Sequence, residues 1–352
     1  MKNSITTMTN EKVDYMTVQP TIHDVARIAG VGIGTVSRVL NDHPSVRPVT
    51  REKVLAAIAQ LRFKPNPIAR SMISKRTGSI GVIVPFFTRP FHTEVLRGVQ
   101  NALSREQKEL IIYNVENDMQ RDHYFSELPM HRKVDGLLII SLPPNDTFVQ
   151  GFHAIGLPTV LVDTYSPHLI SLVVNNVEGA YQAVRSLIDR GHTRIGFING
   201  IIEGNFKFNQ ANDRLIGFHR ALGEAGLLFE PTLVVESEWN RHAGRAAALR
   251  LLAQTPRPTA IFASSDMQAI GVLEAARSLH LAVPAELSVI GFDGIEVSEL
   301  LDLSTVQQPM QQMGEMGIAK LIELLANPHM PPELIRLPTT LIERSTTTSV
   351  GA

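Results

Sequence analysis

The chain has 352 residues, of which 44% are hydrophobic, and it contains no cysteine. Its length suggests two or three domains with sizeable cores, and the lack of cysteine excludes disulfides, thiolate metal sites and cysteine nucleophiles. Residues 20–78 carry ten basic and three acidic side chains, whereas residues 79–352 have a net charge of −8. This asymmetry is typical of a phosphate-binding head on a small-molecule-binding body. A basic face that is merely solvated would show the same charge, and charge alone favours neither interpretation.

Residues 1–19 are polar, and we expect them to form a flexible tail. They contain no apolar core of the signal-peptide type. No run in the whole chain is long and apolar enough to span a bilayer. We therefore expect a cytoplasmic protein that has no membrane partner.

Residues 20–64 contain three helical patterns. Thr21 is the expected N-cap of the first, and Gly30 ends it. The third, over residues 51–61, follows Thr50 as its expected N-cap. Its residues expected to face inward are Val54, Leu55, Ile58 and Leu61. Three short helices with a glycine-containing turn between the first two indicate a helix-turn-helix, although a plain three-helix bundle would show the same pattern.

Residues 65–78 are expected to form a hinge helix and a linker. Asn66 and Pro67 predict the start of a helix of about two turns, which is too short to be stable alone. Met72 lies there among basic residues, a combination that suits an apolar wedge in the minor groove of DNA. The alternative is a linker whose apolar residues pack on the next domain.

Residues 79–346 alternate apolar strands with helices, which predicts two α/β lobes built on parallel sheets. We place residues 79–175 and 308–346 in one lobe and residues 176–307 in the other. The expected strands are 79–85, 110–115, 136–141, 159–163, 194–199, 233–236, 260–264 and 287–291. Ligands of such folds bind outside the carboxyl ends of the strands, and two facing lobes form a cleft that can close by a hinge.

Polar and aromatic side chains follow several of these strands. The candidates for an effector site are Phe91, His92, Asp163, Arg214, Trp239, Ser265 and Asp293. Arg214 lies in the first turn of the helix expected over residues 213–225. Carboxylates and a guanidinium bind sugar hydroxyls, and an aromatic ring packs on the face of a sugar. Some candidates have structural alternatives: Ser265 with Gln268 fits a capping box, and His92 fits a surface position.

The motifs TIHDVARIAGV, TVSRVLN, TREKV and PNPIARSM, in this order, resemble the headpiece and hinge of the lactose/galactose-repressor (LacI/GalR) family, and a looser similarity extends to about residue 345. The resemblance implies a multi-domain chain with an all-α helix-turn-helix headpiece and a two-lobed α/β body like that of periplasmic binding proteins. It implies that Arg38 reads a base edge and that Ile33 and Gly34 vary with operator sequence. The other implied DNA-binding residues are Thr21, Thr35, Ser37, Asn41, Thr50, Asn66, Arg70 and Met72.

These features together predict a homodimeric transcription regulator, in its commonest mode a repressor, on a palindromic operator. A sugar or sugar phosphate is the first expected effector and a nucleobase the second, while no cofactor, metal or catalytic residue is expected. One alternative is a periplasmic-type sugar receptor, for which the basic head would have no use. Another is an α/β enzyme, but the sequence has no phosphate-binding loop, nucleophile elbow, metal cluster or dinucleotide motif.

Overall fold

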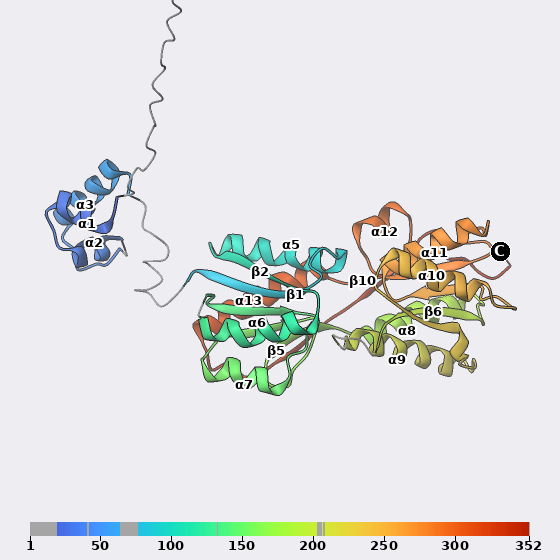
Figure 1. Cartoon of the computed structure of the whole chain (residues 1–352). Coiled ribbons are helices and arrows are strands. Elements are labelled where there is room, and N and C mark those ends of the chain that lie inside the picture. Colours follow the sequence, from blue (N-terminus) through green and yellow to red (C-terminus); the bar gives the residue numbers. More distant parts are fainter. Residues whose placement is uncertain are drawn as a thin grey trace, which may run out of the picture. The chain divides into compact units, whose positions relative to one another are not determined.

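The computed structural model describes residues 20–40, 42–63, 77–131, 133–202, 206 and 208–351. The chain divides into two compact units, Met1–Thr77 and Gly78–Ala352, both of which are drawn in Figure 1. Among the described residues, no helix has the length and apolar character needed to cross a membrane.

The described part of the first unit forms three helices, α1 (Ile22–Ala29), α2 (Ile33–Leu40) and α3 (Pro48–Leu61). Asp24 stabilises the start of α1, because its Oδ2 accepts hydrogen bonds from the backbone N–H of Thr21 at 3.0 Å and from the Thr21 hydroxyl at 2.8 Å. Gly30 ends α1 with a φ of 64°, in the left-handed region that glycine adopts without strain. The sequence-based boundaries of α1 are therefore explained by its two caps.

The core of this unit is made of small and branched apolar side chains, Val25, Ala26, Ala29, Val36, Val39, Val54, Ala57 and Phe63. Two predictions for α3 are wrong. The helix begins at Pro48, whose fixed φ suits the first helical position, so Thr50 lies within the first turn and does not cap it. Leu55 is 51% exposed, because Val54 and Ala57, three residues apart on one face, take the inward positions.

The second unit contains two sheets, which form two lobes (Figure 1). The strands of the first are β1 (Ser79–Pro85), β2 (Glu109–Val115), β3 (Gly136–Ile140), β4 (Thr159–Val162), β5 (Ile170–Val174) and β11 (Leu334–Leu337). The strands of the second are β6 (Ile195–Gly200), β7 (Val234–Ser237), β8 (Ala260–Ala263), β9 (Ser288–Asp293), β10 (Ser304–Gln307) and β12 (Thr340–Ile342). Their orders are β11-β5-β4-β3-β1-β2 and β12-β10-β9-β8-β6-β7, parallel except for the antiparallel pairing of β12 with β10.

Helices cover both faces of each sheet, as expected for parallel sheets with crossover connections. The helices of the first lobe are α5 (Pro90–Arg105), α6 (Asp118–His131), α7 (Asp146–Ala154) and α13 (Met310–Ala326). Those of the second are α8 (Asn176–Asp189), α9 (Asn209–Glu224), α10 (Arg241–Leu252), α11 (Asp266–Ser278) and α12 (Glu296–Leu300), with a 3₁₀ turn at Pro231–Leu233. The helices pack in the pairs α5–α13, α6–α7, α8–α9 and α10–α11.

The two α/β lobes and the eight predicted strands are confirmed, and each strand end lies within two residues of its predicted place. Four short strands, β5, β10, β11 and β12, were not predicted. The assignment of all of residues 308–346 to the first lobe is wrong, because β12 pairs with β10 in the second. Within the described residues, the chain thus passes between the lobes after β5, after β10 and after β11.

Candidate functional site

A pocket lies between the two lobes, at the carboxyl ends of strands from both sheets. It is lined by every residue predicted for the effector site, namely Phe91, His92, Asp163, Arg214, Trp239, Ser265 and Asp293. The other described residues of its lining are Arg89, Pro90, Ser141, Phe208, Gln210, Met267 and Gln308. The fold therefore brings the predicted residues together, and their contact with a ligand stays a prediction.

Unusual backbone conformations occur where four strands end. Phe86, Ser141, Asp163 and Asp293 have φ values of 44°, 56°, 60° and 123°, although none of them is glycine. A side chain in this region costs free energy and persists only where its surroundings hold it, as they often do at functional sites. Three of the four residues line the pocket, so its wall is built on locally unfavourable backbone.

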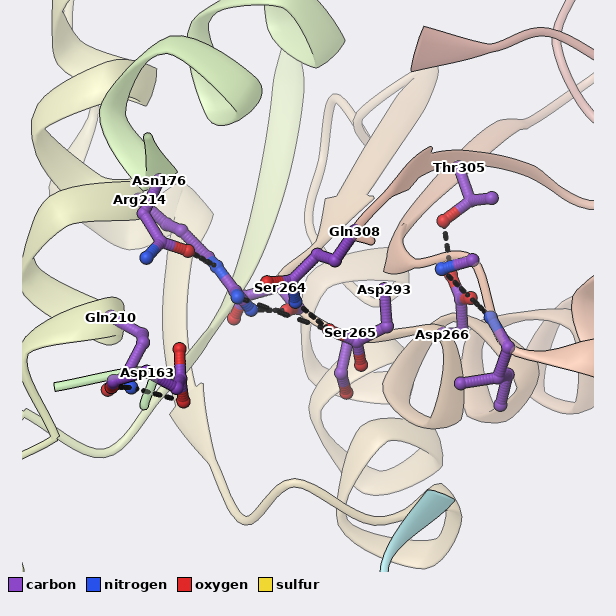
Figure 2. A network of polar contacts seen from close by, with 12 residues as sticks. Asp163, Asn176, Gln210, Arg214, Ser264, Ser265, Asp266, Asp293, Thr305 and Gln308 are labelled. Carbon is purple, nitrogen blue, oxygen red and sulfur yellow. Dashed lines mark hydrogen bonds and ion pairs between the residues drawn. The ribbon is translucent and has the colours of Figure 1, made fainter. Parts of the chain in front are cut away.

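Asp163 joins the two lobes through hydrogen bonds (Figure 2). Its Oδ2 accepts from the Ser141 hydroxyl at 2.6 Å and from Gln210 Nε2 at 2.6 Å, and its backbone carbonyl accepts from the same Nε2 at 2.6 Å. Burial raises the pKa of Asp163 to about 6, although these hydrogen bonds oppose the rise. Because Gln210 belongs to α9 of the second lobe and Asp163 follows β4 of the first, these bonds hold the lobes in the present arrangement.

His92 extends this chain of hydrogen bonds into the first lobe. Its Nε2 lies 3.2 Å from Ser141 Oγ, and its Nδ1 lies 3.4 Å from the backbone carbonyl of Phe86. Burial lowers the pKa of His92 to about 3, so the imidazole is neutral. The side chain is 6% exposed, and the surface alternative for this histidine is therefore wrong.

Arg214 is the buried cation of the second lobe, with 3% of its surface exposed. Its Nε donates to Asn176 Oδ1 at 2.9 Å, and its Nη1 donates to the backbone carbonyl of Ser264 (Figure 2). Its Nη2 lies 4.0 Å from Asp293 Oδ1, and its guanidinium carbon lies 3.7 Å from the centre of the Phe292 ring. Most of the guanidinium is thus held by the protein, and Nη2 is directed toward the carboxylate at the pocket.

Asp293 ends β9 and accepts a hydrogen bond from Gln308 Nε2 at 2.8 Å. Burial raises the pKa of Asp293 to about 8, Arg214 opposes the rise and Asp266 adds to it. A carboxyl group with this pKa is poised to change its charge when a ligand supplies hydrogen-bond donors.

Asp266 fixes the loop that follows Asp293. It is fully buried at the start of α11, and it accepts hydrogen bonds from the backbone N–H groups of Gly294 at 2.8 Å and Ile295 at 2.9 Å. The Thr305 hydroxyl, from β10, donates to its other oxygen at 2.5 Å. Asp266 therefore positions the pocket carboxyl without lining the pocket itself.

Trp239, the only tryptophan of the chain, forms part of the wall from the second lobe. A Cβ atom at Gly200, the last residue of β6, would lie 2.0 Å from Trp239 Cζ2, so only glycine leaves room for the indole there. At the edge of the pocket, Arg89 Nη2 of the first lobe lies 3.6 Å from Glu238 Oε2 of the second. The indole is thus held within the second lobe, whereas the ion pair joins the two lobes and depends on their relative position.

Ser265 shows the capping geometry that was its structural alternative. Its Oγ accepts from the backbone N–H of Gln268 at 3.2 Å and donates to Gln268 Oε1 at 3.0 Å. The cap accounts for the Ser265 hydroxyl, although the residue also lines the pocket.

Three uncharged polar residues of the pocket were not predicted: Ser141, Gln210 and Gln308. Gln210 was missed because α9 begins at Asn209, four residues before the predicted start, and this also places Arg214 in the second turn and not in the first. Gln308 follows β10, which was itself not predicted. Polar residues at the carboxyl end of every strand are the signal that would have found Ser141.

In the first unit, α2 turns its predicted DNA-binding residues away from the core. Ile33, Gly34 and Arg38 are exposed, while Val36 and Val39 on the opposite side are buried. Among the other predicted contacts, Thr21 is exposed and Thr35, Ser37 and Thr50 are half-buried. The predicted DNA-binding residues that lie outside the described residues are Asn41, Asn66, Arg70 and Met72.

A helix-turn-helix unit linked to a two-lobed α/β unit with a pocket between its lobes defines a DNA-binding regulator with a ligand-binding body. The model of bacterial regulatory proteins of the lacI family matches residues 21–66, and that of the periplasmic binding protein-like domain matches residues 184–347.

Similarity to individual proteins covers almost the whole chain. Catabolite control protein A of Priestia megaterium is 33% identical over 90% of this chain and 96% of its own, and the ribose operon repressor of Haemophilus influenzae is 36% identical over 88% and 93%. The structure of the lac repressor dimer bound to operator and the anti-inducer ONPF superposes with a TM-score of 0.82, at 26% identity, over 94% of this chain and 99% of that chain. The chain therefore belongs to the lacI family of bacterial regulatory proteins, and it is a transcription regulator, not an enzyme.

Proposed function

We propose that the protein is a homodimeric repressor whose affinity for a palindromic operator is controlled by a small-molecule effector, a sugar, bound between the lobes of the body. The names of similar proteins support this proposal, since they include repressors of a ribose operon and a lac repressor dimer bound to operator. The observation that carries it is the pocket at the strand ends, which is lined by polar groups from both lobes. A repressor acts on chromosomal DNA, and we accordingly place its action in the cytoplasm.

The exposed side of α2 is the surface that would read the operator. Arg38 is exposed and forms no ion pair with any described residue, so its planar fork of donors is available for the edge of a guanine. Ile33, 42% exposed, offers an apolar contact for a thymine methyl group, and Gly34 presents no side chain to a base. Two copies of this surface in a two-fold dimer would recognise the two half-sites of an inverted repeat.

The pocket is the site that would bind the effector. Asp163 and Asp293 are acceptors for hydroxyl groups, Arg214 Nη2 is a donor, and Trp239 supplies an apolar face. A sugar that contacts Asp163 in one lobe and Asp293 in the other stabilises the arrangement in which both are in reach. Its binding therefore shifts the equilibrium between this arrangement of the lobes and others. The size of the change in operator affinity is set by how much more tightly the effector binds one arrangement than another.

The test uses the full chain and a pool of random duplex DNA. The protein should enrich an inverted repeat, and Arg38→Ala should lose the enrichment. Sugars, sugar phosphates and nucleobases are then screened for a change in affinity for the selected duplex. Enrichment of no common sequence, or a duplex affinity that responds to none of these compounds, would contradict the proposed function.

A further inference from the structure

Building on the proposed function, we infer that the effector is an uncharged free monosaccharide, whose hydroxyl groups donate to the side-chain amide oxygens of Gln210 and Gln308, and that the pocket discriminates against phosphate esters and nucleobases. The two glutamines then determine which effector binds. Gln210 belongs to the second lobe, and Gln308 lies after β10, where the chain passes from the second lobe to the first.

The two amide oxygens are buried acceptors with no donor. Gln210 is 8% and Gln308 3% exposed, and the Oε1 atom of each has no hydrogen-bond partner among the described residues. The orientation of the Gln210 amide follows from its partner, because the backbone carbonyl of Asp163 faces Nε2 and can only accept. The Gln308 amide lies with its Nε2 atom toward Asp293 Oδ1. A buried acceptor left unpaired costs free energy, and both residues line the pocket, so a ligand with donors on two sides removes this cost.

Neither arginine of the pocket has its guanidinium donors free for a phosphate. Arg214 is hydrogen-bonded to Asn176 and to the carbonyl of Ser264, and its remaining nitrogen faces Asp293 at 4.0 Å. Arg89 faces Glu238 at 3.6 Å. Each of the two arginines that line the pocket therefore already has an acidic side chain beside it. A phosphate dianion is usually recognised by arginines free for bidentate contact, and it would here displace carboxylates from both of them.

The acceptors of the pocket require a ligand with hydrogen-bond donors on two sides, and a sugar ring has such donors. One acceptor pair, Gln210 Oε1 with Asp163, involves the first lobe, and the other, Gln308 Oε1 with Asp293, lies across the pocket beside Arg214 (Figure 2). A monosaccharide carries hydroxyl donors around its whole perimeter and an apolar face for Trp239. A free purine base carries fewer donors than a sugar ring, and its ring-nitrogen and carbonyl acceptors are unfavourable beside the acceptors of the pocket.

The experiment measures binding to the full chain by calorimetry and by thermal shift. The probes are the common aldopentoses, aldohexoses and ketohexoses, the phosphate esters of the same sugars, and the nucleobases adenine, guanine and hypoxanthine. We expect at least one free sugar to bind, its phosphate ester to bind at least 10-fold more weakly, and the nucleobases to produce no shift. Tighter binding of an ester or a nucleobase would overturn this inference and leave the proposed function intact, whereas an operator affinity that no probe changes would overturn both.

Substitutions test the roles of the glutamines. Gln308→Met and Gln210→Met keep the length of the side chain and remove the amide. Each should lower the affinity for the sugar at least 10-fold, while the unliganded protein keeps a cooperative thermal transition. Gln182→Met, on α8 outside the pocket, is the matched control and should leave the sugar affinity unchanged. Sugar affinity equal to wild type in both pocket variants would show that the amide oxygens are not the acceptors.

Discussion

The pH dependence of stability offers a direct test of the charge state of the pocket, through the substitution Asp293→Asn. Asp293 is 8% exposed and faces Arg214, Asp163, Asp266 and Gln308. Burial raises its pKa from 3.8 to about 8. The folded protein therefore keeps the proton up to about pH 8, whereas the unfolded chain releases it near pH 4, and the stability associated with the protonated form is lost as pH rises through this window.

The size of the loss follows from the pKa difference. Each pKa unit corresponds to about 1.36 kcal/mol, so the change from pH 5 to pH 9 spans about three units and has an upper limit of about 4 kcal/mol. Relaxation of the pocket and entry of water reduce such penalties, and we expect a loss of about 2 kcal/mol. An asparagine at this position would carry no charge at either pH and would still accept from Gln308, so Asp293→Asn should not show this loss.

The assay is urea unfolding of the effector-free protein at pH 5 and pH 9, monitored through the fluorescence of Trp239. This residue is the only tryptophan and reports on the second unit. Asp163 and Asp266 also titrate and interact with Asp293, so the difference between the two proteins includes the change in their pKa values. The exposed control Asp302→Asn should behave like wild type. Parallel pH dependences for wild type and Asp293→Asn would refute the assignment of a raised pKa to this carboxyl group.

Three further predictions concern the operator, the aromatic wall and the edge of the pocket. Arg38→Ala should cost about 1–3 kcal/mol on the selected operator and less on random DNA in titrations of labelled duplex; equal losses on both would show a phosphate contact only. Gly200→Ala would place a Cβ atom 2.0 Å from Trp239 Cζ2, and it should lower the unfolding free energy by about 1–3 kcal/mol and change the tryptophan emission; unchanged emission and stability would contradict this packing. Arg89→Ala and Glu238→Ala should open the lobes to similar extents in small-angle scattering, with no additional effect in the double variant, whereas additive effects would exclude the ion pair as a contact between lobes.

The features predictable from sequence were those with a strong local signal. Strands buried on both faces appear as continuous apolar runs such as residues 79–85 and 136–140, and helices between them complete the α/β rhythm. Because parallel strands present their carboxyl ends at one edge, polar residues after separate strands can be grouped into one site from the sequence alone. Asp163 and Asp293 were found in this way.

The missed features depend on contacts distant in sequence. β12 has three residues, and its place in the second sheet is determined by pairing with β10. Gln308 enters the pocket only because the chain crosses between the lobes at this point, and no local pattern marks such a crossing. The left-handed φ values at Ser141 and Asp163 are likewise imposed by their surroundings, since neither residue type favours that conformation strongly enough to predict it.

The central claim, that the pocket controls the operator, is tested most directly by measuring the coupling between the two ligands. Operator affinity of the full chain is measured without and with a saturating concentration of the binding sugar, and sugar affinity is measured without and with operator. We predict that both affinities change by the same factor, about 5- to 150-fold, as thermodynamic linkage requires, and that Asp293→Ala removes the change while operator affinity without sugar is retained. Binding of the sugar in the pocket with no change in operator affinity would contradict the account.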